Sequence, residues 1–113
     1  MATPLASNIV AGGLLQAAQT IGGNGVVLLR GEASRGSILV VLTNRGRIEV
    51  ILERILDSQG DYCWNRTKNN ESLQSETVAQ FIGKRKRFDP DIWALELDVP
   101  DVERFIADSL AET

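Results

Sequence analysis

A run of five residues that is apolar at every position constrains the fold of this chain most. In Ile38-Leu39-Val40-Val41-Leu42, neither face of an extended strand would carry a polar side chain. Successive side chains of a strand point to opposite faces of its sheet, so a strand of this composition has both faces covered. The sequence therefore predicts a central strand that is buried on both sides.

Three further segments with strand character lie close to this run. Residues 26–30 precede it, across a polar stretch at 31–36 that lacks the lysine and the following helix of a phosphate-binding loop. Residues 48–53 follow it after the turn signal Asn44-Arg45-Gly46, and Tyr62-Cys63-Trp64 makes a short fourth strand. We interpret residues 31–36 as a hairpin loop and predict an antiparallel meander.

Charged residues flank the apolar positions of the third of these segments. We expect four of them to form exposed cross-strand charge pairs: Arg47, Glu49, Glu53 and Arg54. Surface pairs of this kind contribute little to stability.

Apolar residues at helical spacing mark three more segments. The first follows Ser7, a predicted N-cap, and ends at Gly22-Gly23, because glycine readily adopts the left-handed conformation of a helix C-cap. The second has Ser75 as its predicted N-cap and runs into the basic residues 84–87. Pro100 begins the third.

Between the last two helices, residues 92–99 alternate between apolar and acidic side chains and predict a fifth strand. The order of elements is then α-β-β-β-β-α-β-α. No stretch resembles a linker or an internal repeat, and 113 residues suit one compact domain. We predict a single α+β domain over residues 1–113, in which an antiparallel meander packs against N-terminal, middle and C-terminal helices.

The residue types that the chain lacks exclude several kinds of enzyme. The sequence has no histidine and a single cysteine, Cys63. Nucleophile pairs of Ser or Cys with His are therefore absent, as are imidazole ligands and a thiolate cage for zinc. Cys63 lies in a short apolar and aromatic run, which favours a small packed hydrophobe over a reactive thiol. We expect no cofactor, no bound metal ion and no catalytic activity.

The charge and hydropathy of the chain bear on its partners and its location. Its 12 Lys and Arg and 15 Asp and Glu give a formal net charge of -3, whereas nucleic-acid-binding domains are usually basic. Residues 1–7 have no Lys or Arg before the first apolar positions, unlike the start of a secretory signal. No apolar run approaches the length of about 18 residues that a membrane span needs. We expect a cytoplasmic protein that does not associate with membranes.

The most distinctive stretch of the chain is residues 84–98. A basic helix end runs into Asp89-Pro90-Asp91-Ile92-Trp93 and then into an acidic strand. This stretch resembles the signature of a family of small bacterial proteins catalogued as domain of unknown function 1491, as do Gly31-Glu32 and Gly36 before the central strand. The resemblance covers residues 5–98 and implies a bacterial, cytosolic protein of one domain. It implies no assigned biochemical role and therefore supplies no catalytic residues.

The first candidate site is a basic run at the end of the second helix: Lys84, Arg85, Lys86 and Arg87. Four adjacent cations would bind the phosphates of RNA or DNA, with Trp93 or Phe88 stacking on a base. A regular helix, however, spreads four consecutive residues around its circumference. We therefore favour a structural role, in which these cations complement the negative end of the helix and pair with Asp89 and Asp91.

The second candidate site consists of acidic residues near the fifth strand: Asp89, Asp91, Glu96 and Asp98. Pro90-Asp91 followed by Glu96-Leu97-Asp98 has the outline of a nuclease motif, in which two carboxylates hold a metal ion and a lysine activates water. The spacing is shorter than that motif requires, and Asp98 occupies the position of the lysine. Strand alternation also puts Asp91 on the opposite face from Glu96 and Asp98. We interpret these residues as a solvated strand face.

The sequence is best explained as a small, non-enzymatic interaction module. We expect a homodimer or a larger assembly through an uncovered sheet edge, or another protein partner bound through apolar residues such as Trp93. The alternative is an accessory nucleic-acid-associated protein that binds phosphates through residues 84–87 and loses its binding as salt rises. A third class, a metal-dependent hydrolase, predicts a stabilisation by Mg²⁺ that Asp91→Ala removes.

Overall fold

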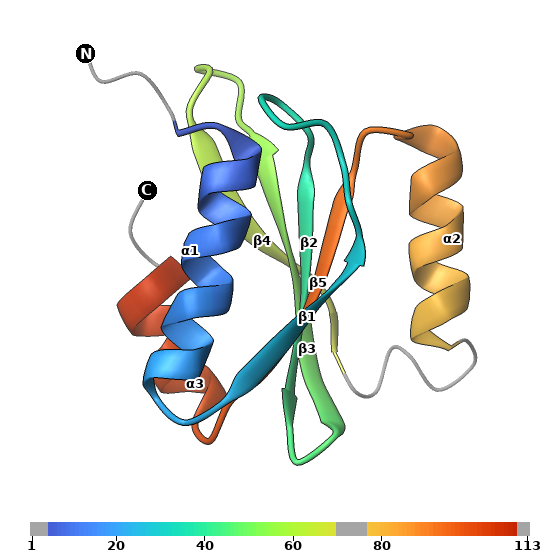
Figure 1. The fold of residues 1–113 in the computed structure, drawn as a ribbon. Helices are drawn as coiled ribbons and strands as arrows, with labels where there is room; N and C mark the ends of the chain where they lie inside the picture. Colours follow the sequence, from blue (N-terminus) through green and yellow to red (C-terminus); the bar gives the residue numbers. More distant parts are fainter. Residues whose placement is uncertain (1–4, 70–76, 111–113) are drawn as a thin grey trace.

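The computed structural model describes residues 5–69 and 77–110, apart from the side chains of residues 68 and 69. The elements follow the predicted order except at the end, where the last helix passes into a turn of π-helix (Figure 1). They are α1 (Ser7–Thr20), β1 (Asn24–Leu29), β2 (Ile38–Asn44), β3 (Arg47–Leu56), β4 (Tyr62–Asn69), α2 (Val78–Phe88), β5 (Trp93–Asp98), α3 (Val102–Phe105) and the π-helical η1 (Ile106–Leu110). None of the helices in the described ranges is long and apolar enough to cross a membrane.

The five strands form one mixed sheet in the order β1-β5-β2-β3-β4 (Figure 1). β5, the last strand of the chain, lies between β1 and β2 and runs parallel to β2, with Val40 opposite Leu95. The other neighbouring strands are antiparallel. The predicted antiparallel meander is therefore wrong at one point. β1 and β2 are not neighbours, so residues 31–36 are not a hairpin loop.

The position of β5 agrees with the burial of the strands. β2 is buried along its whole length except at Asn44, and four of the six residues of β5 are buried. In β1, by contrast, exposed and half-buried residues alternate. Strands at the centre of a sheet have both faces covered by other elements, which suits the apolar β2 and β5. An edge position suits β1, whose residues are exposed or only half-buried.

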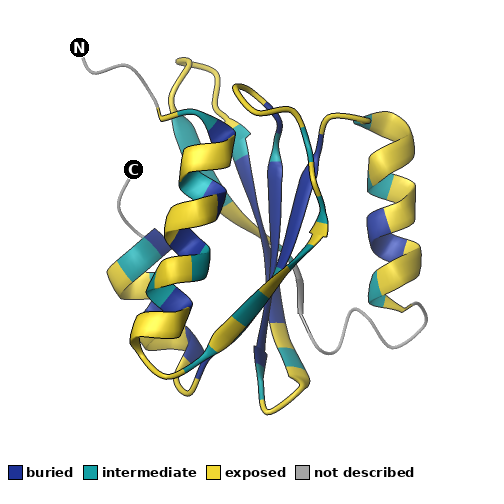
Figure 2. Ribbon diagram, in the orientation of Figure 1, coloured by how far each residue is buried: buried dark blue, intermediate teal, exposed yellow. Residues whose placement is uncertain are grey.

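The predicted coverage of β2 on both sides is confirmed. Residues 38–42 are all 0% exposed. The helices α1 and α3 lie against one face of the sheet, here called the α1 face, and α2 lies against the other, the α2 face (Figures 1 and 2). Burial of apolar surface stabilises a fold by roughly 25 cal/mol per Å². The apolar surface buried between the helices and each face therefore holds the helices on the sheet.

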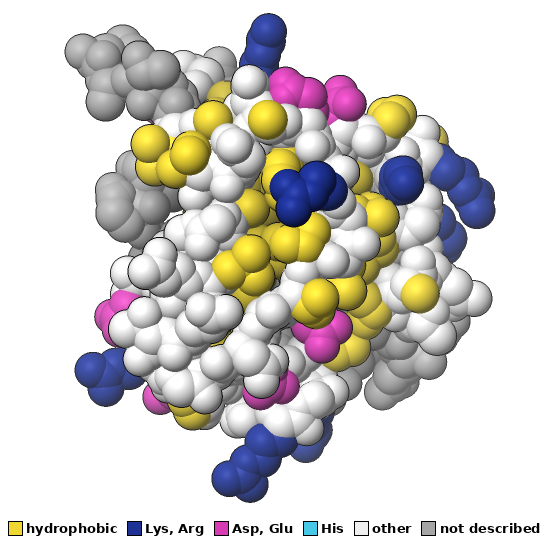
Figure 3. Space-filling view, in the orientation of Figure 1, with side chains coloured by type: hydrophobic (Ala, Val, Ile, Leu, Met, Phe, Trp, Pro, Cys, Tyr) yellow, Lys and Arg dark blue, Asp and Glu magenta, His cyan; other side chains and the backbone are white. Residues whose placement is uncertain are grey.

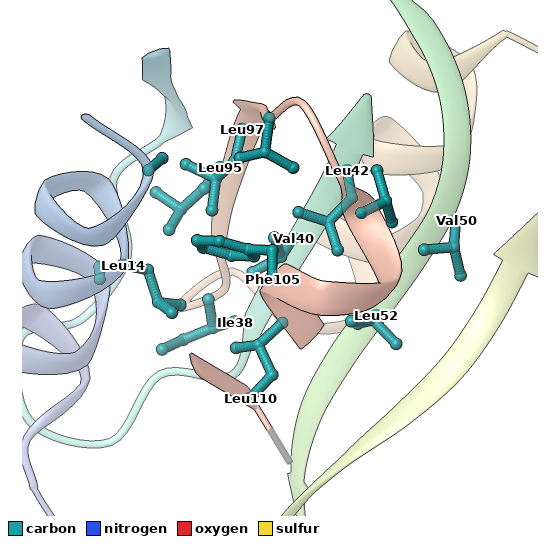
Figure 4. Close-up of a cluster of buried hydrophobic side chains, with 14 of the residues drawn as sticks. Leu14, Ile38, Val40, Leu42, Val50, Leu52, Leu95, Leu97, Phe105 and Leu110 are labelled. Atoms are coloured by element: carbon teal, nitrogen blue, oxygen red, sulfur yellow. The ribbon is translucent and has the colours of Figure 1, made fainter. Parts of the chain in front are cut away.

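The two faces carry separate hydrophobic clusters. The cluster on the α1 face is the larger (Figure 4) and includes Leu14, Ile38, Val40, Leu42, Leu52, Leu95, Leu97, Phe105 and Leu110. The cluster on the α2 face consists of Leu39, Val41, Ile51, Phe81, Ile82, Ile92 and Ala94. Alternate residues of β2 therefore belong to different clusters, as the strand periodicity requires.

The start of α1 differs from the prediction. Its N-cap is Ala6, which makes no side-chain capping bond, and Ser7 is buried inside the first turn. The hydroxyl of Ser7 donates a hydrogen bond of 2.6 Å to the carbonyl of Gly36. The amides of Ser7 and Asn8 donate to the carbonyls of Ser34 and Ala33, at 3.2 and 2.8 Å. The loop before β2 thus supplies the acceptors that a capping side chain would otherwise provide.

The start of α2 is capped by Thr77 rather than by Ser75, which lies outside the described residues. The hydroxyl of Thr77 accepts from the amide of Gln80, and the side chain of Gln80 accepts from the amide of Thr77. This reciprocal pair of hydrogen bonds is a capping box, and it fixes the residue at which α2 begins.

Candidate functional site

The four cations of the basic run point in different directions around α2, as the helix periodicity predicts. Arg85 faces the sheet and forms an ion pair with Glu53 of β3. Its Nη1 donates to Oε1 of Glu53 at 2.7 Å, and its Nη2 donates to Oε2. Lys84, Lys86 and Arg87 are exposed. The run therefore does not form one cationic patch, and the ion-pair partner of Arg85 is Glu53 rather than the predicted Asp89 or Asp91.

The pair of Arg85 and Glu53 fastens α2 to the sheet. Phe81 and Ile82 are the buried apolar residues of α2. The apolar contact between this helix and the sheet is therefore small, and the ion pair adds a second attachment. A fork-shaped guanidinium that binds both oxygens of a carboxylate also fixes its orientation. The hydrogen bonds that Arg85 donates to Glu53 raise the pKa of Arg85, and the negative charges of Glu53 and Asp89 add to the effect.

Trp93 is part of the core and not an exposed aromatic platform. Its side chain is buried, and its indole Nε1 donates to the carbonyl of Glu32 at 2.7 Å. The guanidinium of Arg30 lies over the ring, 5.5 Å from the centroid. These contacts use both the N–H and one face of the indole, so the ring cannot stack on a base.

The loop at residues 31–36 packs directly on the chain before β5. A Cβ on Gly31 or on Gly36 would lie 2.2 Å from the carbonyl oxygen of Asp91, and a real Cβ never approaches backbone that closely. The amide of Glu32 also donates to this carbonyl, at 2.9 Å. Together with Ser7, these contacts join the loop, the start of β5 and the start of α1 into one junction. Gly31, Gly36 and Trp93, three residues that stand out in the sequence, thus have packing roles in this junction.

The acidic residues do not gather into a cation site. The carboxylate of Asp98 accepts from the hydroxyl of Thr43 at 2.7 Å and from the amides of Gly46 and Arg45 at 2.8 and 3.2 Å. The bond from Thr43 and those from the two amides lower the pKa of Asp98. Asp91 is exposed in the turn before β5. No group of three or more Asp, Glu or Cys side chains in residues 5–69 and 77–110 is placed to hold a metal ion.

The charged residues of β3 were predicted to be exposed, and for two of them this is wrong. Glu53 and Arg54 are 6% and 7% exposed. The local pattern contains a signal for their burial, because the consecutive apolar residues Val50, Ile51 and Leu52 interrupt the alternation expected of a half-exposed strand. β3 is covered on both faces over this stretch, so its charges are buried with it.

Arg54 differs from Arg85 in having no carboxylate partner within the described residues. Its Nη2 donates to the carbonyl of Leu5 at 3.4 Å, and its guanidinium lies 3.8 Å from the centroid of the Tyr62 ring. Its Nη1 is buried and has no hydrogen-bond partner. Burial lowers the pKa of Arg54, and the Tyr62 side chain opposes that effect.

The two edges of the sheet differ in character. Among the strands that the structure describes, β1 pairs with β5 alone, and it carries no charged residue and no proline. Its Val26 and Leu28 are 53% and 38% exposed, and Figure 3 shows hydrophobic side chains at the surface where β1 crosses the front of the molecule. β4, at the other edge, includes Asn65 and Arg66 as exposed residues.

The exposed end of α2 carries Phe88, one of the two aromatic residues that the sequence offered for base stacking. Phe88 follows Phe81 by seven residues, a spacing that predicts burial on the same helix face. It is instead 87% exposed, next to the exposed Lys86 and Arg87. The last turn of α2 is exposed in Figure 2.

Comparison with protein families confirms the resemblance found in the sequence. A family model described as "Protein of unknown function (DUF1491)" matches residues 5–107. The chain belongs to the DUF1491 family. The junction of Trp93 with Gly31 and Gly36 and the exposed α2 end are thus features of a DUF1491 protein, and the family description assigns no activity.

Solved structures share the fold. A DUF1491 family protein from Caulobacter crescentus CB15 has a TM-score of 0.75 at 22% identity, covering 96% of this chain and 100% of that one. A protein from A. tumefaciens has a TM-score of 0.76 at 19% identity, covering 98% of both chains. At these identities the likeness establishes the fold alone. A search of functionally curated proteins finds no match.

Proposed function

We propose that this DUF1491 protein is a non-enzymatic interaction module of the bacterial cytoplasm that associates with a second copy of itself along β1. The proposal is supported mainly by the contrast between the two edges of the sheet. An edge strand offers a row of unpaired N–H and C=O groups, and proteins usually protect such edges with charges, prolines or bulges. β1 has neither a charge nor a proline.

The residues of β1 suit pairing with an identical strand. In a two-fold symmetric dimer, the same surface contributes to both sides of the contact. Antiparallel pairing of β1 with its copy would place no like charges opposite each other, because Asn24–Leu29 contains none. It would also bring the exposed Val26 and Leu28 of each copy next to apolar neighbours. The register shift between Val27 and Leu29 is the one protective feature of this strand.

The test is the mass of the protein in solution, measured by sedimentation velocity over a range of protein concentrations. We expect a dimer whose fraction increases with concentration. Val26→Lys adds a charge to an exposed position of β1 and should shift the protein to a monomer without unfolding it. Asn65→Lys places the same charge on an exposed position of β4 and should leave the dimer intact. A monomer at all concentrations, or an unaltered dimer for Val26→Lys, would contradict the proposal.

A second candidate function is binding of single-stranded nucleic acid at the end of α2. The observation that favours it is the exposure of Phe88 beside Lys86 and Arg87. An aromatic ring flanked by cations suits base stacking combined with phosphate contacts. Arg85 is held by Glu53, so this surface has fewer cations than the sequence suggested.

Fluorescence anisotropy with a labelled single-stranded oligonucleotide tests this second function. Binding should weaken steeply as salt rises, and it should be lost in the double variant Lys86→Glu and Arg87→Glu. Phe88→Ala should remove the stacking contribution. The double variant Arg35→Glu and Arg47→Glu, which makes the same charge change at exposed positions outside α2, serves as the control and should retain most of the binding. Equal binding by all these variants would exclude the end of α2 as the binding surface.

A further inference from the structure

Arg54 places a guanidinium inside the protein without a counter-charge among the described residues. The residue lies on the α1 face of β3, between Ile38 and Trp64 of the neighbouring strands, and is 7% exposed. Arginine keeps its charge in proteins, and charged side chains are rarely buried completely unless they are paired. A buried cation in this position therefore calls for an anion.

The contacts of Arg54 leave part of its hydrogen-bonding edge unused. The Tyr62 ring covers one face of the Arg54 guanidinium, 3.8 Å from the ring centroid. The N–H groups of the guanidinium lie in its own plane, so this stacking contact does not satisfy them. Nη2 has one long bond of 3.4 Å, to the carbonyl of Leu5. Nη1 has no partner although it is buried. A buried donor of a charged group that lacks an acceptor is costly.

The charges of the described residues do not relieve this cost. Glu53 is next to Arg54 in the sequence, but it points to the α2 face and is bound to Arg85. The first turn of α1, which starts beside Leu5, contains no acidic residue. A helix carries a partial positive charge at its N-terminus, so α1 adds positive potential near Arg54. The amides of Ser7 and Asn8 already donate to the loop before β2. The start of α1 therefore supplies positive electrostatic potential near Arg54, but these two amides are not available to a ligand.

We propose that Arg54 is the centre of a binding site for a small oxyanion, a carboxylate or a phosphate group, beside the start of α1. The planar fork of a guanidinium matches the oxygens of both groups. The buried Nη1 of Arg54, which has no acceptor, is the donor that such an oxygen would accept from once the ligand displaces the atoms that cover it. The ring of Tyr62 holds the guanidinium in place by stacking on one of its faces. The site lies on β3, separated from β1 by β5 and β2, so it is independent of the proposed dimer.

The test is thermal unfolding in a chloride buffer to which phosphate, sulfate, acetate or citrate is added at constant ionic strength. For the wild type we expect at least one oxyanion to raise the Tm by about 4 °C or more at saturation. The arms with phosphate and sulfate, compared with acetate and citrate, distinguish a phosphate ligand from a carboxylate. Arg54→Met should lose the response. Arg47→Met, an exposed position on the same strand, should keep it.

A second readout separates a binding role from a structural one. In chloride alone, Arg54→Met should be at least as stable as the wild type, because it removes a buried charge that has no partner. An NMR titration of the wild type should show saturable shifts concentrated at the amides of Leu5, Tyr62 and Trp64, and it decides the matter even where Arg54→Met fails to fold. The proposal is overturned by a wild type that responds to no oxyanion, by an equal response in Arg54→Met, or by shifts that lie elsewhere.

Discussion

Glu53 and Arg54 are consecutive residues of β3 whose charged side chains are buried on opposite faces of the sheet. Glu53 meets Arg85 of α2 through two hydrogen bonds. Arg54 meets the ring of Tyr62 and one carbonyl. One strand thus presents a paired charge to the α2 face and, to the α1 face, a charge that no described residue pairs with. The first holds a helix in place, whereas the second leaves a donor that a ligand can use.

Removal of Arg85 should destabilise the protein strongly. Arg85→Ala leaves the carboxylate of Glu53 buried without its partner, and we expect a loss of about 3 kcal/mol in the free energy of unfolding. Replacement of both partners, by Glu53→Leu and Arg85→Met together, should cost much less, because no charge then stays buried. Urea unfolding measures both. Lys86→Ala, on the exposed side of the same helix, should change stability by less than about 0.5 kcal/mol. Equal losses for Arg85→Ala and Lys86→Ala would show that the ion pair does not hold α2.

The glycines of the loop before β2 should not tolerate a side chain. In Gly31→Ala and Gly36→Ala, the new Cβ would meet the carbonyl oxygen of Asp91, which belongs to the backbone and cannot turn aside. We expect each variant to lose about 2 to 3 kcal/mol of stability. Gly83→Ala is the matched control, since a Cβ there has no atom within 4 Å. In the middle of α2 it should stabilise the protein by about 0.5 to 1 kcal/mol. Denaturant midpoints with opposite shifts for the two kinds of variant would agree with this geometry, and a neutral Gly31→Ala would contradict it.

Acid should weaken the contact that Asp98 makes with the turn between β2 and β3. Hydrogen bonds from Thr43 and from the amides of Gly46 and Arg45 lower the pKa of Asp98 below its ordinary value of 3.8. A carboxyl group with a lowered folded-state pKa contributes stability above its ordinary pKa, and this contribution is lost as the pH falls through the folded-state pKa. We therefore expect Asp98→Asn to flatten the loss of stability below about pH 4.

Thr43→Val provides the corresponding control for Asp98. It removes the hydroxyl that makes the largest contribution to the shift and nearly keeps the side-chain shape. The pKa of the Asp98 carboxyl, followed by NMR, should move back toward its ordinary value in this variant. An Asp98 that already titrates at the ordinary value in the wild type would refute the assignment.

Phe88 and Trp93, the two aromatic residues of the distinctive stretch, should behave in opposite ways. Trp93→Phe removes the N–H that the carbonyl of Glu32 accepts and leaves a small void in the core, so it should cost about 2 kcal/mol of stability. Phe88→Ala removes a ring that is 87% exposed and should change stability by less than about 0.5 kcal/mol. Thermal unfolding of both variants checks this. A large loss for Phe88→Ala would mean that the ring packs on the protein in solution.

Much of the candidate site depended on contacts that no local pattern records. The helix period correctly predicted that residues 84–87 spread around α2, because that is a property of the helix itself. It did not predict that Arg85 would meet Glu53, which is 32 residues away in the chain. Trp93 stood out in the sequence, but its bond to the carbonyl of Glu32 spans 61 residues. The buried Nη1 of Arg54, which has no hydrogen-bond partner, becomes apparent only once the strands and helices around it are in place.

By itself, the sequence determined the elements, the central and doubly covered β2, and the membership of the family. These follow from apolar periodicity, turn residues and a distinctive motif, which are all local. Only the tertiary structure decided that β5 lies between β1 and β2. As a result, β1 is an edge strand, and residues 31–36 pack against Trp93 instead of forming a hairpin loop. The physical reason is that periodicity states which side chains are buried, whereas the partners of a strand depend on how all the buried faces pack together.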